Sequence, residues 1–153
     1  MVAAVLSSCS QSASPAASGA LLFNGDAHVV VSGQEHGEFT VPLGRGGVLS
    51  GGSFMTAEYG AVQLGALTYQ GPALVGDHRT ARTESTVTSL MITLSLPDHN
   101  PPYDTYTSLA GECVVTVKEA GPSGGTATFS CAKVPNVDGT VLVDAQGTFD
   151  AHP

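Results

Sequence analysis

The stretch that decides the fold is ECVVTVKEAGPSGGTATFSCA, residues 112–132. It contains two runs, Glu112–Glu119 and Thr126–Ala132, in which apolar side chains occupy every second position. This alternation is typical of β-strands with one buried face. The residues between the runs, Ala120–Gly125, include Gly and Pro and have the composition of a turn. The stretch therefore predicts a β-hairpin.

One antiparallel register brings the apolar faces of the two runs together, in three opposed pairs: Cys113 with Cys131, Val115 with Phe129, and Val117 with Ala127. A slip of one residue would move these side chains to opposite faces of the sheet. Opposed residues of a non-hydrogen-bonded pair lie close enough for a disulfide. We therefore predict a disulfide between Cys113 and Cys131, which requires an oxidising compartment. The alternative is two buried thiols, or one buried and one free.

The rest of the chain also has the pattern of strands, with Val and Thr dominating and no convincing helix. Further strands are expected around Val29–Val31, Ser53–Tyr59, Phe39–Leu43, Val62–Tyr69, Ser85–Leu96 and Thr140–Ala151. Pro97–Pro102 ends one of them, and Asp138-Gly139 is a type I′ turn signal. About eight strands predict an all-β fold, an antiparallel β-sandwich. A closed β-barrel is the alternative.

The composition excludes some classes of protein. The chain has 153 residues, the length of a single domain, and a net charge of -8 with five Lys and Arg. So few cations cannot neutralise a phosphate backbone, so nucleic acid is not an expected partner. Hydrophobic residues form 42% of the chain, which is enough to build a core. No run of about 18 apolar residues is present to span a bilayer as a helix.

The N-terminal residues have the features of an export signal. The apolar Met1–Leu6 is followed by Ser7-Ser8-Cys9, and Leu6–Cys9 resembles the lipobox of bacterial lipoproteins, whose cysteine is acylated. The small, uncharged Ser10–Gly19 cannot bury enough surface to fold and suits a tether. We assign residues 1–8 to a partial signal segment that lacks its basic residues, 9–24 to the lipidated Cys9 and a flexible linker, and 25–153 to the β-sandwich. The alternative is a frayed apolar N-terminus with a free cysteine.

No catalytic or metal motif is convincing. Gly121–Gly125 matches G-x-S-x-G, but it links two short strands without a following helix, so a hairpin loop is favoured over a nucleophile. Three histidines directly follow a carboxylate, namely His36, His78 and His99, but none of the five histidines has the spacing of a zinc site. We expect no catalytic residues, no metal and no cofactor.

The candidates for ligand contact are polar and aromatic side chains expected on loops: Tyr103, Tyr106, His78, Arg79, Arg82 and His99. Tyrosine on a loop suits recognition because its ring is apolar and its hydroxyl polar. The alternative for the tyrosines is packing of the ring on the rim of the sandwich. For the histidines and their acidic neighbours it is ordinary loop polarity.

The chain resembles the small lipoproteins common in actinobacteria. The resemblance lies in the lipobox, the Ser/Ala/Pro tether and three C-terminal segments, Gly111–Val117, Thr128–Cys131 and Gly147–Phe149. The layout is similar to that of mycobacterial lipoprotein antigens. This resemblance implies a lipid-anchored, exported, non-enzymatic envelope protein whose β-domain binds a ligand or partner. Two alternatives remain. One is a secreted hydrolase or metal-dependent enzyme, in which His78 or His99 would meet a carboxylate in a cleft. The other is a structural or adhesive surface module.

Overall fold

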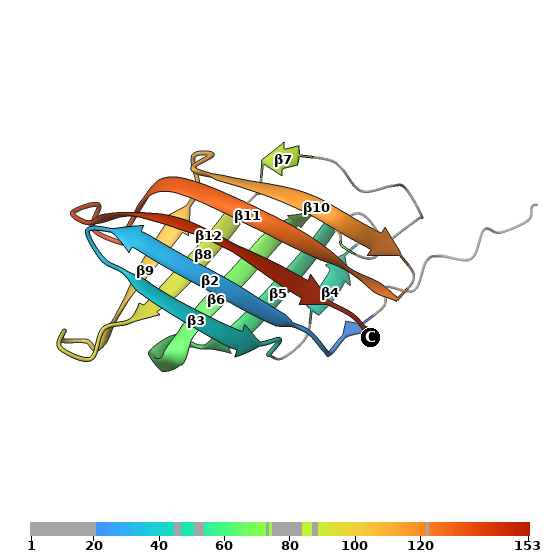
Figure 1. Ribbon diagram of the computed structural model, residues 1–153, viewed down its shortest axis with the longest axis horizontal. Helices are drawn as coiled ribbons and strands as arrows, with labels where there is room; N and C mark the ends of the chain where they lie inside the picture. Colours follow the sequence, from blue (N-terminus) through green and yellow to red (C-terminus); the bar gives the residue numbers. More distant parts are fainter. Residues whose placement is uncertain are drawn as a thin grey trace, which may run out of the picture.

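Two antiparallel six-stranded sheets make up the computed structural model, which describes residues 21–44, 47–50, 54–72, 74, 84–86, 89–121 and 123–153. The first sheet contains, in spatial order, β1 (Leu21–Leu22), β4 (Gly47–Ser50), β5 (Phe54–Ala61), β6 (Gly65–Pro72), β8 (Ser89–Ser95) and β9 (Tyr103–Ser108). The second contains β3 (Gly37–Pro42), β2 (Asp26–Gly33), β12 (Leu142–Ala151), β11 (Gly124–Pro135), β10 (Cys113–Gly121) and β7 (Glu84–Thr86). The sheets stack face to face and their strands cross (Figure 1).

The prediction of an antiparallel β-sandwich is confirmed, although twelve strands are present instead of about eight. Each sheet is open, because β1 and β9 end the first and β3 and β7 end the second. The fold is therefore not a closed barrel. A single turn of 3-10 helix, Val62–Leu64, lies between β5 and β6.

The predicted hairpin is β10–β11, and its register is the predicted one for all three apolar pairs, up to a bulge after Val117. Cys113 and Cys131 are opposed and joined by a disulfide. The Ala132 N–H donates to the Glu112 carbonyl at 2.9 Å, so the neighbouring pair is hydrogen-bonded and the cysteine pair is not. The geometry that the sequence reasoning required for the disulfide is therefore present.

The prediction of one strand over Ser85–Leu96 is wrong. Glu84–Thr86 forms β7 and pairs with β10, whereas Ser89–Ser95 forms β8 and pairs with β6 and β9 in the other sheet. Apolar alternation begins only at Leu90, so nothing in the preceding residues specifies the sheet to which they belong.

The core lies between the sheets and is built by the alternating positions of the strands. On β12 the predicted inward positions Val143, Ala145, Phe149 and Ala151 are all buried. Three tyrosines, Tyr59, Tyr69 and Tyr106, are among the largest fully buried side chains. The ring of Phe149 packs against the rings of Tyr59 and Tyr69, with centroids 5.9 and 4.8 Å apart.

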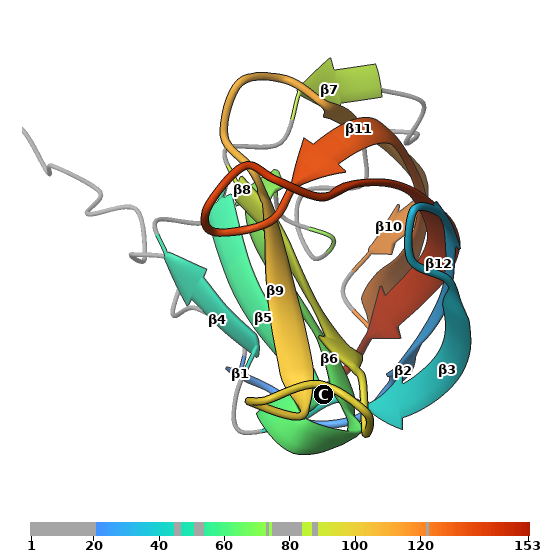
Figure 2. The ribbon, with the colours of Figure 1, turned by 90° about the vertical axis from the view of Figure 1, so that its left-hand side faces the viewer.

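The described chain enters and leaves the sandwich at the same end. Asn24 forms a β-bridge with His152, and its Nδ2 donates to an oxygen of Pro153 at 2.8 Å. Leu22, which the sequence assignment placed in the linker, is fully buried and belongs to the sheet. The connections β2–β3, β8–β9 and β11–β12 lie together at the opposite end (Figure 1), and Figure 2 looks at that end directly.

Candidate functional site

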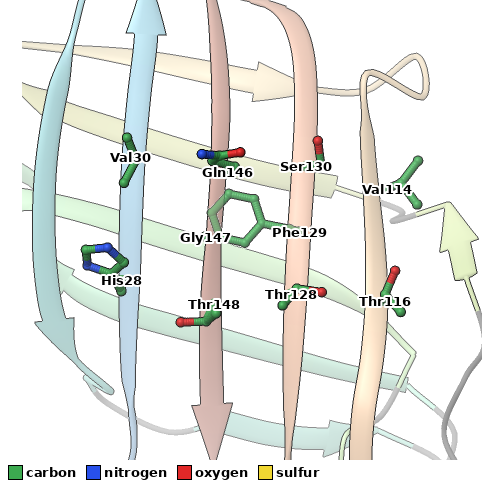
Figure 3. A pocket seen from close by; sticks show the side chains of 10 residues that line it. All are labelled: His28, Val30, Val114, Thr116, Thr128, Phe129, Ser130, Gln146, Gly147 and Thr148. Atoms are coloured by element: carbon green, nitrogen blue, oxygen red, sulfur yellow. The ribbon is translucent and has the colours of Figure 1, made fainter.

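Two hollows of similar volume on the described surface of the sandwich are candidates for holding a ligand. The first, the outer groove, has a volume of about 560 Å³ and lies on the outer face of the second sheet (Figure 3). Strands β2, β10, β11 and β12 supply its lining: His28, Val30, Val114, Thr116, Thr128, Phe129, Ser130, Gln146, Gly147 and Thr148.

Gly147 lies at the centre of the outer groove, directly opposite Phe129 on the neighbouring strand. The Phe129 ring lies against Gly147 (Figure 3), and a Cβ at position 147 would come within 2.8 Å of that ring. The same Cβ would also collide with the His28 carbonyl oxygen. A glycine is therefore required here because two neighbours already fill the space of a side chain.

A row of hydroxyl groups crosses the outer groove. The register places Thr116 opposite Thr128, Thr128 opposite Thr148, and Thr148 opposite His28. At the end of the row, His28 Nδ1 lies 3.1 Å from Thr40 Oγ1. The lining contains no Lys, Arg, Asp or Glu. Such a surface can exchange hydrogen bonds with a neutral polar molecule, but its side chains do not converge on one point.

The second region, the end cleft, is lined by residues of the β8–β9 and β11–β12 connections, which lie at the same end of the sandwich (Figure 1). Its volume is about 560 Å³, within the usual range for small-molecule sites. Its lining consists of His99, Asn100, Pro101, Tyr103, Asp104, Asn136, Val137 and Asp138. A smaller hollow of about 320 Å³ adjoins it across His99 and includes Glu35, His36, Ser95 and Asp98.

Asp104 is held in place by hydrogen bonds to both carboxylate oxygens. The Thr105 N–H donates to Oδ1 at 2.8 Å, and Asn136 Nδ2 donates to Oδ2 at 2.9 Å. Asn136 Oδ1 in turn accepts from the Val141 N–H at 3.0 Å, and Asn136 forms a β-bridge with Tyr106. This network joins β9 of one sheet to the end of β11 in the other, so the carboxylate is rigidly placed.

The β11–β12 connection supplies the second carboxylate of the end cleft. Gly139 N–H donates to the Asn136 carbonyl at 3.0 Å, so the turn spans Asn136–Gly139. Asp138 does not have positive φ, so the predicted type I′ turn centred on Asp138-Gly139 is wrong. The Thr140 hydroxyl and then its N–H donate to Asp138 Oδ1, and these hydrogen bonds lower the pKa of Asp138. Asp138 is therefore an anion at neutral pH.

Tyr106 has a buried hydroxyl without a hydrogen-bond partner among the described residues. The side chain is 0% exposed, and it lies in β9 two residues from Asp104, on the same face. Burial raises the pKa of this hydroxyl, and the charges of Asp104 and Glu35 raise it further. The Asp104 carboxylate also raises it as a nearby hydrogen-bond acceptor, although the two groups do not meet the distance and angle of an ordinary hydrogen bond. Buried polar groups without partners are uncommon, and each one needs an explanation.

His99 and Glu35 come from two different acid–histidine pairs of the sequence, yet they lie together. His99 Nε2 is 3.9 Å from Glu35 Oε1, and both side chains are partly exposed. The sequence placed Glu35 beside His36 and gave no sign of this contact. The β2–β3 and β8–β9 connections bring the two residues together because both lie at the same end of the sandwich.

The end cleft therefore unites two of the predicted contact residues, Tyr103 and His99. The expectation that Tyr106 lies on a loop is wrong, because it lies in β9 at an inward position and its side chain is fully buried in the core behind the cleft. The predictions for Cys9, His78, Arg79 and Arg82 lie outside the described residues. Sequence reasoning missed Asp104, Asn136 and Asp138, for which the only signal was their position next to predicted turns.

In the described part of the chain, no three or more His, Cys, Asp or Glu side chains are grouped so as to hold a metal ion. No helix among the described residues has the length and apolar character needed to cross a membrane. Comparisons with protein-family models, curated proteins and solved structures found no match.

Proposed function

We propose that this chain is an exported, lipid-anchored protein of the bacterial cell envelope whose β-sandwich binds a ligand in the end cleft without changing it chemically. The end cleft is the observation that carries the binding function. It combines a rigid carboxylate and an anionic Asp138 on a scaffold of strand ends, with the buried Tyr106 hydroxyl behind its lining. Binding sites are commonly loops positioned by such a scaffold.

The disulfide supports the extracytoplasmic location, because such bonds persist in oxidising compartments. With Cys113 and Cys131 joined, Cys9 is the remaining cysteine of the three in the chain, which agrees with its use for a lipid. A single acyl chain binds membranes only weakly, so the multiple acylation implied by the lipobox suits stable anchoring.

Metabolic labelling with a palmitate analogue tests the anchor. We expect the full-length product in a bacterial host to be labelled and to fractionate with membranes, and Cys9→Ala to lose both properties. The double variant Cys113→Ala/Cys131→Ala is the matched control, because it removes cysteines but leaves the lipidation position. An unlabelled wild type, or a Cys9→Ala variant that is still labelled, would disprove the anchor.

One observation favours a second candidate, a hydrolase. His99 and Glu35 meet beside Ser95, which lines the same hollow. A serine nucleophile needs a hydrogen bond of about 2.6–3.2 Å to its base. No such bond joins Ser95 to His99 in the described structure, so ligand binding is the better supported function. Hydrolysis of p-nitrophenyl acetate that His99→Gln abolishes and His28→Gln does not would favour the enzyme.

A further inference from the structure

We infer that the end cleft binds a ligand carrying a primary ammonium group on an alkyl stem, such as a lysine side chain or a free diamine. This inference rests on the proposed binding function and names the chemistry of its ligand. Three independent features of the end cleft support it, namely its charge, its unpartnered hydroxyl and its apolar walls.

The charge of the end cleft is complementary to a cation. Asp104 and Asp138 contribute carboxylates to the lining, and Glu35 lies across His99 from them. The lining includes no Lys or Arg, and His99 is its one basic side chain. The net charge of -8 adds a field that attracts cations to the whole molecule.

The Tyr106 hydroxyl, which lies directly behind the lining of the end cleft, is the second feature. It is fully buried, it makes no hydrogen bond of ordinary geometry among the described residues, and the nearby polar group is the Asp104 carboxylate of the cleft. An ammonium group that enters beside Asp104 can donate to the phenol oxygen and to the carboxylate at once, since it has three donors. The ligand would then supply the hydrogen bond that the hydroxyl lacks among the described residues. No such bond is available from an apolar ligand.

The walls of the end cleft match an alkyl stem. Pro101, the Tyr103 ring and Val137 line it beside the carboxylates, and Val137 is 84% exposed. An aromatic ring can also attract an ammonium group through its π-face. A lysine-like ligand has this combination of an apolar stem and a charged head.

Two other cations fit the end cleft less well. Calcium takes six to eight oxygen ligands, and the described residues do not group three or more acidic or histidine side chains for a metal. A guanidinium group prefers a carboxylate with both oxygens free for a bidentate contact. Both oxygens of Asp104 already accept a hydrogen bond, so a single ammonium donor suits the remaining lone pairs better.

An NMR titration of the full chain tests the inference. The probes are 1,5-diaminopentane and N-acetyl-lysine methylamide, with the ε-acetylated form of the latter as the uncharged comparator. We expect the side-chain amide signal of Asn136 to shift with saturation, because its Nδ2 donates to Asp104. The side-chain amide of Asn24, at the opposite end of the sandwich, should not move. Binding of only the diamine or only the lysine derivative identifies the source of the ammonium group, and either result supports the inference.

Variants then assign the contacts. Asp104→Asn removes the charge but keeps the shape, and we expect the dissociation constant to rise about tenfold or more, as for loss of a charged hydrogen bond. Tyr106→Phe should raise it several-fold. Asp150→Asn is the matched control. Asp150 also accepts a backbone hydrogen bond, from the Asp26 N–H at the opposite end of the sandwich, so this variant should bind the amine like the wild type. If Asp104→Asn does not fold, the exposed Asp138→Asn serves in its place.

Several results would overturn the inference. In the titration, the ε-acetylated comparator would bind as tightly as the charged lysine derivative, or the Asn136 signal would not shift at about 10 mM amine. Among the variants, Asp104→Asn would bind the amine as tightly as Asp150→Asn, or Tyr106→Phe would bind it as tightly as the wild type. Binding of calcium chloride with no binding of either amine would also refute it. Because palmitate labelling does not depend on amine binding, failure of the ligand assignment and failure of the anchor are separate results.

Discussion

Two buried tyrosines provide a test with opposite expected signs, because removing the same oxygen atom removes different interactions. The Tyr59 hydroxyl donates to the Asp150 carbonyl at 2.7 Å, and Tyr59 is 1% exposed. The Tyr106 hydroxyl is equally buried but lacks a partner among the described residues. Tyr59→Phe and Tyr106→Phe are thus the same chemical change in two environments that differ in hydrogen bonding.

The magnitudes follow from the hydrogen bond that each change removes. A satisfied buried hydrogen bond contributes about 1 kcal/mol net to stability. Its loss in Tyr59→Phe also leaves the Asp150 carbonyl without this donor, so the free energy of unfolding should fall by about 1–2 kcal/mol. A buried hydroxyl without a partner carries a desolvation penalty of about 1–3 kcal/mol. Tyr106→Phe should therefore raise the free energy of unfolding by about 1 kcal/mol. The two variants should differ by about 2 kcal/mol or more.

Urea unfolding followed by far-ultraviolet circular dichroism measures this difference, and the slope with denaturant should be the same in both variants. For a domain of this size, 1 kcal/mol corresponds to about 2–4 °C in melting temperature, so thermal melts should separate the variants by about 4–8 °C. The reasoning is refuted if Tyr106→Phe is destabilised as much as Tyr59→Phe. The Tyr106 hydroxyl would then have a partner in solution and would not be available to a ligand.

Three further changes test other parts of the fold. Replacing Cys113 and Cys131 together by Ala opens a loop with a sequence separation of 18, which should cost about 3 kcal/mol in urea unfolding; free thiols in the unreduced exported protein would contradict the pairing. Gly147→Ala should lower the free energy of unfolding by about 3 kcal/mol or prevent folding, since the new Cβ collides with the His28 carbonyl. A soluble variant as stable as the wild type would show that the backbone of the strand moves to make room for the methyl group. Hydrogen bonds from backbone N–H groups, first that of Glu112 itself and then that of Ala110, lower the pKa of Glu112. Its stabilisation is therefore present above the unfolded pKa and lost as pH falls through the folded value. Glu112→Gln should be about 1 kcal/mol less stable than wild type at pH 7 and indistinguishable from it at pH 2, and a deficit that persists in acid would exclude the charge as its cause.

The sequence predicts the hairpin β10–β11 well because two local constraints agree there. The apolar residues alternate on both strands, and only one register brings Cys113 and Cys131 together with their apolar neighbours. The inward face of β12 is predictable for the same reason. Each of these inferences uses residues close in sequence, where periodicity of two directly specifies which face is buried.

The sheet to which Glu84–Thr86 belongs was not predictable from the sequence. These residues have no apolar alternation, and they pair with the edge of β10 that is not already paired with β11. The end cleft was predictable only in part. Tyr103 and His99 were identifiable as polar residues near a proline-rich break, whereas the contact of His99 with Glu35 depends on how two distant connections meet. The hydrogen bond from Asn136 to Asp104 links opposite sheets, so it follows from stacking and not from any local pattern.

The end cleft and the first described residues of the chain lie at opposite ends of the sandwich, which determines which charges act on a cation in the cleft. The described chain enters the sandwich at Leu21, at the end opposite the cleft, and β12 spans this length with 10 residues, or about 33 Å. That distance is several times the Debye length of about 8 Å at physiological ionic strength. Charges at the entry end of the sandwich are therefore largely screened from a cation in the end cleft. A charge change at that end, such as Asp150→Asn, should therefore leave the affinity of the end cleft for an amine unchanged, and an affinity that falls as far as in Asp104→Asn would refute this reasoning.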